Sequence, residues 1–365
     1  MKKSYLKIFP VLAGGLFLML LADSCKKDHS TPTPDPVNFA KLGLYEKLTG
    51  NNLRIFIAVS KIGDQTVSYA PFFDTGSAGL TLDANGILPA SMITASGIQV
   101  AGDSVNVNGI TVTTQQAIVT YGGADSEVQE YGNLAYAPIV IGDANGNVTT
   151  PRIPIFLYYK VVDVNTNMQL PAHTADVFGV GPGISYASRM ISSPLSYFKL
   201  PDNVTSGFRL AALNTGAFNA SATYVPNLLY IGLIPNDLNA SGFIMHPLGY
   251  SAISGYLPTI SSTITYSGQS IAGSILFDTG TPSTTIIENS AATSNMATLP
   301  ANTNVAITTS HGFSYQYSTG SAFNITEVEN PSYSNDTRTI FSIDFFVHNE
   351  FLLDYTNHRI GLKNN

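Results

Sequence analysis

Two short segments, one in each half of the sequence, place an aspartate after apolar residues and directly before Thr-Gly. The first reads Phe-Phe-Asp-Thr-Gly-Ser around Asp74, and the second reads Leu-Phe-Asp-Thr-Gly-Thr around Asp278. Burial raises the pKa of a carboxyl group, and two neighbouring carboxyls cannot both ionise cheaply, so such a pair shares a proton. One member can then act as a base that activates water while the other acts as an acid. The repeat therefore predicts acid–base chemistry wherever the fold brings the two segments together.

The residues that follow each aspartate are suited to holding such a pair. Thr75 and Thr279 can hydrogen-bond from one loop to the other through their hydroxyls. Gly76 and Gly280 let the backbone turn tightly and approach the opposing loop. Asp-Thr-Gly is also an ordinary turn sequence, so a single copy would carry little weight. Two copies, each behind an apolar run and one in each half, favour a functional interpretation.

Short strands separated by turn residues must position these loops. Predicted strands cover residues 53–60, 65–73 and 110–121, and the second of them delivers Asp74. Short helices are predicted near residues 193–200 and 291–301. The composition is 44% hydrophobic and only 11% charged, with many Gly, Thr, Ser, Asn and Tyr residues, which indicates an all-β protein. A chain of 365 residues suits two lobes.

The N-terminus is typical of a targeting segment. Lys2 and Lys3 precede an apolar run at residues 8–21, which is short for a membrane span. Cys25, the only cysteine of the chain, follows small residues just beyond that run. This arrangement resembles a bacterial lipoprotein signal, in which residues 1–24 are removed and Cys25 is lipidated. A plain secretory signal and a membrane anchor are the alternatives.

From this segment we expect an exported protein anchored to the membrane, periplasmic or at the cell surface. Residues 25–37 then form a polar, Pro-rich tether. A single cysteine provides no intramolecular disulfide, so hydrophobic cores must hold the lobes. The net charge is −7 and no long basic run follows the N-terminus, so nucleic acid is not expected as a partner.

From about residue 38 to residue 363, the order of motifs resembles that of the pepsin-like aspartic endopeptidases. The motifs are the two aspartate loops, the segment Thr-Tyr-Gly-Gly that begins at Thr120, Val-Phe-Gly-Val-Gly-Pro ending at Pro182, and Phe-Leu-Leu-Asp-Tyr ending at Tyr355. The resemblance implies an all-β, bilobal fold with two mostly antiparallel lobes, a central cleft and few short helices. The N-terminal lobe would cover residues 38–236 and the C-terminal lobe residues 237–365.

The resemblance also implies roles for individual residues. Asp74 and Asp278 would be the catalytic pair. Tyr121 and Gly122 would belong to a flap hairpin over a bound peptide, and Tyr256 would line the primed side of the cleft. The residues that would support the pair are Thr75, Gly76, Ser77, Thr279, Gly280 and Thr281. The implied activity is endopeptidase cleavage by a monomer acting on peptide or protein, with no cofactor and no metal.

Two departures from the family pattern are visible in the sequence. A bulky Ile343 stands where the second lobe is expected to have a glycine beside its aspartate. The chain has no tryptophan, so the usual partner of the flap tyrosine is absent, and Thr81 lies near that place. These changes keep open a second hypothesis, a catalytically weak or inactive scaffold that binds peptide or protein.

Other charged and metal-ligating residues give no competing chemistry. The histidines show no metal-ligand spacing. Asp125, Glu127 and Glu130 lie in the predicted flap, where they could favour basic substrates. The simpler expectation is that they keep the tip of the hairpin solvated.

Overall fold

The computed structural model describes residues 37–365, apart from residues 123–126, 186–189 and 294. The predicted signal segment, most of the tether, Cys25 and Asp125 lie outside the described residues. Within the described part of the chain, no helix is long and apolar enough to cross a bilayer.

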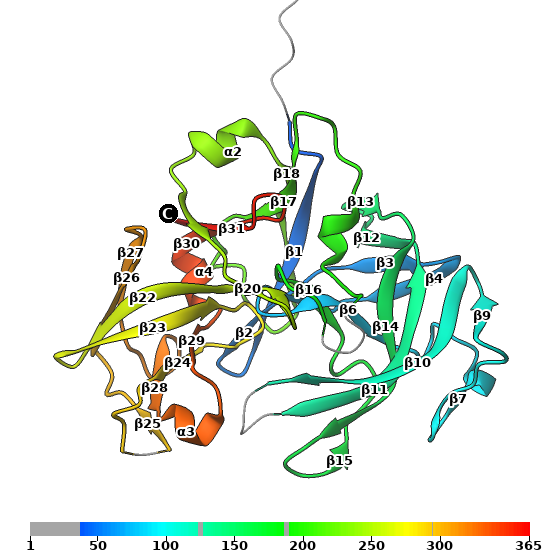
Figure 1. The fold of residues 1–365 in the computed structure, drawn as a ribbon, viewed down its shortest axis with the longest axis horizontal. Helices are drawn as coiled ribbons and strands as arrows, with labels where there is room; N and C mark the ends of the chain where they lie inside the picture. Colours follow the sequence, from blue (N-terminus) through cyan, green and yellow to red (C-terminus); the bar gives the residue numbers. More distant parts are fainter. Residues whose placement is uncertain (1–36, 123–126, 186–189, 294) are drawn as a thin grey trace, which may run out of the picture. The chain divides into compact units, whose positions relative to one another are not determined.

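The described residues form two sheet-rich lobes (Figure 1). The largest sheet has 15 strands and combines most of the first lobe with strands from the end of the chain. In spatial order its strands are β19 (Ile244–Pro247), β31 (Arg359–Asn364), β30 (Asn349–Asp354), β17 (Thr205–Leu210), β18 (Thr223–Leu233), β1 (Ala40–Thr49), β2 (Asn52–Phe56), β5 (Phe72–Asp74), β16 (Val177–Val180), β6 (Ala78–Asp83), β14 (Ile153–Asp163), β11 (Val128–Ala137), β10 (Ile110–Tyr121) and β9 (Ser104–Val107), with β15 (Met168–Gln169) beside β14.

A second sheet of eight strands makes the other lobe, drawn in yellow and orange in Figure 1. Its order is β25 (Met296–Thr298), β28 (Ile325–Glu329), β24 (Thr284–Glu288), β29 (Arg338–Phe341), β23 (Gln269–Phe277), β22 (Thr259–Tyr266), β26 (Asn304–Thr309) and β27 (Ser314–Ser318). Strand β22 alternates buried and exposed residues, with Ile260 and Ile264 buried and Ser261 and Thr263 exposed. This period of two is expected of a strand with one face on the core.

The remaining elements are small. A four-stranded sheet has the order β13 (Gly146–Thr149), β12 (Ile139–Asp143), β3 (Val59–Ile62) and β4 (Gln65–Tyr69), and the two-stranded ribbons are β7 (Ile93–Thr94) with β8 (Gly97–Ile98) and β20 (Tyr250–Ser251) with β21 (Gly255–Tyr256). The described helices are η1 (Ala90–Met92), η2 (Pro194–Tyr197), α2 (Pro235–Asn239), α3 (Pro331–Ser334) and α4 (Asp344–His348). The all-β fold class predicted from composition is confirmed.

Candidate active site

The two Asp-Thr-Gly loops, far apart in sequence, meet through a symmetric set of hydrogen bonds. The backbone N–H of Thr75 donates to Thr279 Oγ1 at 3.1 Å, and the N–H of Thr279 donates to Thr75 Oγ1 at 3.0 Å. Each hydroxyl in turn donates across to the opposite strand, Thr75 to the carbonyl of Phe277 at 2.8 Å and Thr279 to that of Phe73 at 2.6 Å. Both threonines are buried, so these bonds lock the two loops together away from water.

Each loop also holds its own carboxylate through hydrogen bonds from the residues that follow the aspartate. The N–H of Gly76 donates to Asp74 Oδ1 at 2.7 Å, and Ser77 Oγ donates to Asp74 Oδ2 at 2.5 Å. In the second loop, Asp278 receives the matching bonds from the Gly280 N–H at 2.8 Å and Thr281 Oγ1 at 2.6 Å. The two carboxyl groups are therefore presented in equivalent ways by equivalent residues.

The environment of this pair favours sharing of one proton. Burial raises the pKa of Asp74 well above its usual value, and both the charge of Asp278 and a hydrogen bond with its side chain raise it further. The bonds from Ser77 and Gly76 act in the opposite direction. The side chains of buried Asp74 and partly buried Asp278 are hydrogen-bonded. With one member held neutral, such a pair can donate a proton from one carboxyl and accept one at the other.

Two glycines allow the carboxyls to come this close. A Cβ added to Gly76 would lie 2.6 Å from Asp278 Cγ, and one added to Gly280 would lie 2.9 Å from Asp74 Cγ. Neither position leaves space for a methyl group. The glycines after each Asp-Thr therefore set the separation of the two loops.

In each lobe, a neighbouring strand pairs with the strand that carries the aspartate. In the second lobe, the residue that this pairing places beside the aspartate is not the predicted one. In the first lobe, Gly179 of β16 pairs in parallel with Asp74, and a Cβ there would lie 2.8 Å from Ser77 Oγ. In the second lobe, β23 pairs Phe277 with Phe341, so the register places Ser342 next to Asp278. The prediction that Ile343 fills the glycine position is wrong, because that residue lies one step further along. Its side chain is fully buried and its N–H donates to the Thr281 carbonyl at 3.0 Å.

Tyr121 ends β10, and Gly122 follows with a φ of +89°, a conformation that glycine adopts readily. Strand β10 pairs with β11 in an antiparallel hairpin, which Figure 1 shows projecting from the first lobe. The Tyr121 hydroxyl donates to Thr81 Oγ1 at 3.4 Å. Burial raises the pKa of this phenol, and the charges of Glu130 and then Asp74 raise it further. The structure thus brings the predicted flap tyrosine near the pair, and Thr81 is its polar partner.

Thr81 connects Tyr121 to Glu130, a buried acid that was expected from the sequence at the solvated tip of the hairpin. Thr81 Oγ1 donates to Glu130 Oε1 at 3.3 Å, and the Glu130 side chain has no exposed surface. The other oxygen, Glu130 Oε2, is buried without a hydrogen-bond partner. The expectation that Glu130 keeps the hairpin tip solvated is therefore wrong, because its position on β11 points into the lobe.

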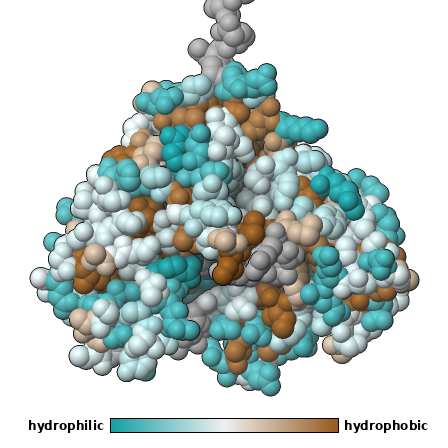
Figure 2. Space-filling view, in the orientation of Figure 1, coloured by the Kyte–Doolittle hydropathy of each residue, from teal (hydrophilic) through white to brown (hydrophobic). Residues whose placement is uncertain are grey.

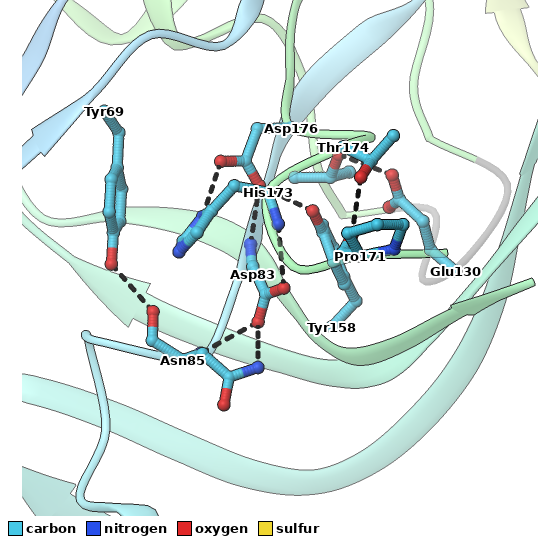
Figure 3. Close-up of polar contacts among 10 residues, drawn as sticks. Tyr69, Asp83, Asn85, Glu130, Tyr158, Pro171, His173, Thr174 and Asp176 are labelled. Carbon is cyan, nitrogen blue, oxygen red and sulfur yellow. Dashed lines mark hydrogen bonds and ion pairs between the residues drawn. The ribbon is translucent and has the colours of Figure 1, made fainter. Parts of the chain in front are cut away.

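Burial raises the pKa of Glu130 well above its usual value, and the charges of Asp176 and Asp83 add to that shift. Figure 3 shows these acids together with their partners. Asp176 accepts hydrogen bonds from Tyr158 at 2.7 Å and from His173 Nδ1 at 3.0 Å. Asp176 also accepts from the N–H of Asp83 at 2.7 Å, so the cluster joins the end of β6 to β14 and to the segment before β16.

Glu130→Gln is expected to remove a pH dependence of stability. Because the folded-state pKa is raised, the folded protein keeps a proton that the unfolded chain loses above pH 4.5. The wild-type free energy of unfolding therefore falls by about 1.4 kcal/mol per pH unit while the folded carboxyl stays protonated. Glutamine is neutral throughout, so the free energy of unfolding of the variant rises relative to that of the wild type from pH 4 to pH 7.

Urea unfolding at several pH values measures this difference. Glu127→Gln is the matched control, since Glu127 belongs to the same hairpin but is partly exposed. If the Glu130→Gln and wild-type curves stay parallel from pH 4 to pH 7, Glu130 does not hold its proton in the folded state.

Among the contacts of the described residues, none joins Tyr256 to either of the two aspartate loops. It belongs to β21, and its ring stacks on His358 at 3.5 Å between centroids. Tyr250 packs edge to face against the ring of Tyr256, with 5.2 Å between the ring centroids. No described contact joins Tyr256 to Asp74 or Asp278, so its predicted role on the primed side remains a prediction.

One charged residue beside the pair was not identified from the sequence. Arg54 of β2 donates from Nη1 to the carbonyl of Gly280. The signal was present, because Arg54 is the only charged residue of the predicted strand 53–60. Among the described residues, no group of three or more His, Cys, Asp or Glu side chains is placed to hold a metal ion.

Comparisons with known proteins bear on the fold. No protein-family model matches the chain, and no curated protein sequence matches it. An aspartic proteinase from Irpex lacteus has a similar structure, with a TM-score of 0.55 and 17% identity over 89% of this chain and 98% of that one. Basic 7S globulin from soybean is also similar, with a TM-score of 0.57 and 13% identity over 90% of this chain and 96% of that one.

Identities this low show a shared fold and nothing finer. The two sheet-rich lobes, the mostly antiparallel strands and the few short helices agree with both structures. The chain therefore has the pepsin-like bilobal fold, in which one solved structure is named a proteinase and the other a globulin.

Proposed function

We propose that this protein is an aspartic endopeptidase. The observation that carries the proposal is the carboxyl pair of buried Asp74 and partly buried Asp278, held in equivalent ways by two matching loops. In the proposed reaction, a water between the carboxyls loses a proton to the ionised member as it attacks the peptide carbonyl. The protonated member donates to the developing charge on the substrate, and no covalent intermediate forms.

The surroundings of the pair suit a peptide substrate. Figure 2 shows the molecular surface hollowed between the two lobes, in the lower middle of the view. An extended peptide in this hollow would lie beneath the β10–β11 hairpin, with Tyr121 closing over it. Closure of such a hairpin excludes water and orders the substrate.

A second candidate function is binding without cleavage. It is favoured by the same fold in a soybean protein named a globulin. Both Asp-Thr-Gly loops and all their cross-loop hydrogen bonds are present here, which a binding role does not require. We therefore place the endopeptidase first.

Cleavage of a denatured protein from pH 3 to pH 7, with and without the inhibitor pepstatin, tests the proposal. Endopeptidase activity predicts fragments that pepstatin suppresses, with a pH profile set by the shared proton. A folded preparation that yields no fragments at any pH would rule out the enzyme and favour the binding role.

A further inference from the structure

Arg54 places a cation beside the carboxyl pair, and the proposed reaction has no use for this cation. On β2, Leu53 and Ile55 are buried in the core, so Arg54 lies on the opposite face of the strand. The guanidinium packs over the ring of Phe72, with its Cζ 5.0 Å from the ring centroid. Its Nη1 donates to the carbonyl of Gly280, the glycine at which an added Cβ would collide with both carboxyls.

The charge of Arg54 is within electrostatic range of both aspartates. Burial lowers the pKa of the guanidinium, whereas the charges of Asp278 and Asp74 raise it. Arginine remains protonated in proteins at any working pH. The site therefore contains a permanent positive charge beside a pair that carries one negative charge in its working form.

Most of the hydrogen-bonding capacity of Arg54 is unused by the described residues. A guanidinium has five N–H donors, and the bond to Gly280 uses one of them. Arg209, Arg338 and Arg359 each have a carboxylate within ion-pair distance, but no described carboxylate lies that close to Arg54. None of its nitrogens is both buried and unpaired, so the remaining donors are open to solvent.

We propose that Arg54 is a specificity-determining residue that binds a carboxylate of the substrate peptide. The carboxylate is either an acidic side chain or the C-terminus of the peptide. The planar fork of a guanidinium matches a carboxylate through two parallel hydrogen bonds. Without this cation, the negative pair would repel an anionic peptide. This inference rests on the proposed function, because it assigns the substrate preference of the same site.

Two other roles for Arg54 make different predictions. If it only holds the second loop through Gly280, its loss lowers activity on every peptide alike. If it only tunes the proton shared by Asp74 and Asp278, its loss moves the pH–rate profile equally for all peptides. A substrate carboxylate bound by Arg54 instead predicts an effect that depends on the charge of the peptide.

The experiment uses one cleavable peptide in several forms. A neutral form carries glutamine and a C-terminal amide, a second set carries glutamate in place of glutamine at single positions, and a third form has a free C-terminus. We expect wild-type kcat/KM to be roughly tenfold higher for at least one anionic form than for the neutral form. Arg54→Gln should abolish that preference while still cleaving the neutral peptide, and Arg54→Lys should restore part of it.

Arg152→Gln is the matched control, since Arg152 also packs over a ring, that of Tyr136 at 5.1 Å, but is exposed on the first lobe. It should leave the preference unchanged. High salt should weaken the preference in the wild type because screening reduces charge pairing. An equal preference in wild type and Arg54→Gln would overturn the inference, as would an equal loss on all peptides.

Failure of the proposed function can be told apart from failure of this inference. If the wild type cleaves no peptide in any form, the endopeptidase assignment fails. Binding of the same peptides, labelled and followed by fluorescence anisotropy, then still tests Arg54. Tighter binding of an anionic form to wild type than to Arg54→Gln supports the inference, and identical affinities contradict it.

Discussion

Replacing Asp74 or Asp278 by asparagine is expected to lower kcat/KM by at least about a thousandfold, since each variant removes one half of the acid–base pair. Asparagine has the same shape as aspartate and keeps an oxygen that can accept the bonds from Gly76 or Gly280. The fold should therefore survive, and circular dichroism together with the unfolding midpoint will show this. Activity is measured on a denatured protein or on a peptide substrate at the optimum pH of the wild type.

The double variant should be no worse than either single variant, because the two carboxyls act as one unit and their effects are not additive. Asp344→Asn is the matched control. Asp344 is a buried aspartate at the start of α4, with its pKa raised mainly by burial, and it contacts the N–H of Asn324 rather than the pair. Turnover retained within tenfold in Asp74→Asn or Asp278→Asn would refute the dyad.

Gly76→Ala is expected to lower kcat/KM by about a hundredfold or more without changing either aspartate. The new methyl would lie 2.6 Å from Asp278 Cγ, so one loop must move away from the other. Displacements of about 1 Å at a reacting centre have effects of this size. Gly280→Ala should behave similarly, because its methyl would lie 2.9 Å from Asp74 Cγ.

The measurement compares kcat/KM and pepstatin affinity in these variants with those of Gly273→Ala. Gly273 belongs to β23, the strand that leads to Asp278, but its nearest neighbour is Ile264 Cδ1 at 3.7 Å, so a methyl fits there. Full activity in Gly76→Ala would mean that the loops tolerate a wider separation, and the close approach would then not matter for catalysis.

Local sequence signals predicted one of the three strands well, whereas the strand predicted at residues 53–60 is divided between β2 and β3 in different sheets. Strand 110–121 is observed with the predicted bounds, as β10. The alternation of apolar residues and the turn residues at both ends determine such a strand locally. The meeting of the two loops could be anticipated only because the same tripeptide occurs twice, since no local property brings Thr75 to Thr279.

Other elements depended on contacts between distant segments. The single strand predicted at residues 65–73 is two strands in different sheets, and Pro71, which cannot donate a ladder hydrogen bond, lies between them. The helix predicted near residues 291–301 is replaced by β25, whose residues pair with β28. This tertiary pairing outweighs the helical preference of the alanines.

Side chains on the hairpin were harder to place than the hairpin itself. Glu130 and Glu127 both lie in a run of acidic residues, which suggested a solvated tip. Only the register of β10 with β11, which pairs Glu130 with Val119, shows that Glu130 lies on the inner face. A difference of one residue decides burial in a strand. Ser342 and Ile343 are both fully buried, and it is the register of β23 with β29 that places Ser342 beside Asp278.

The reciprocal bonds between Thr75 and Thr279 have a consequence for biosynthesis. During translation, the first loop is made some 200 residues before the second, and it has no partner for its hydroxyl or N–H during that interval. Strand β30, which lies beside β17 in the large sheet, and β31, which pairs with β30, are made later still. If the protein is the proposed endopeptidase, we expect the nascent chain to have no activity until the second loop has emerged, so the timing of synthesis would protect the producing cell.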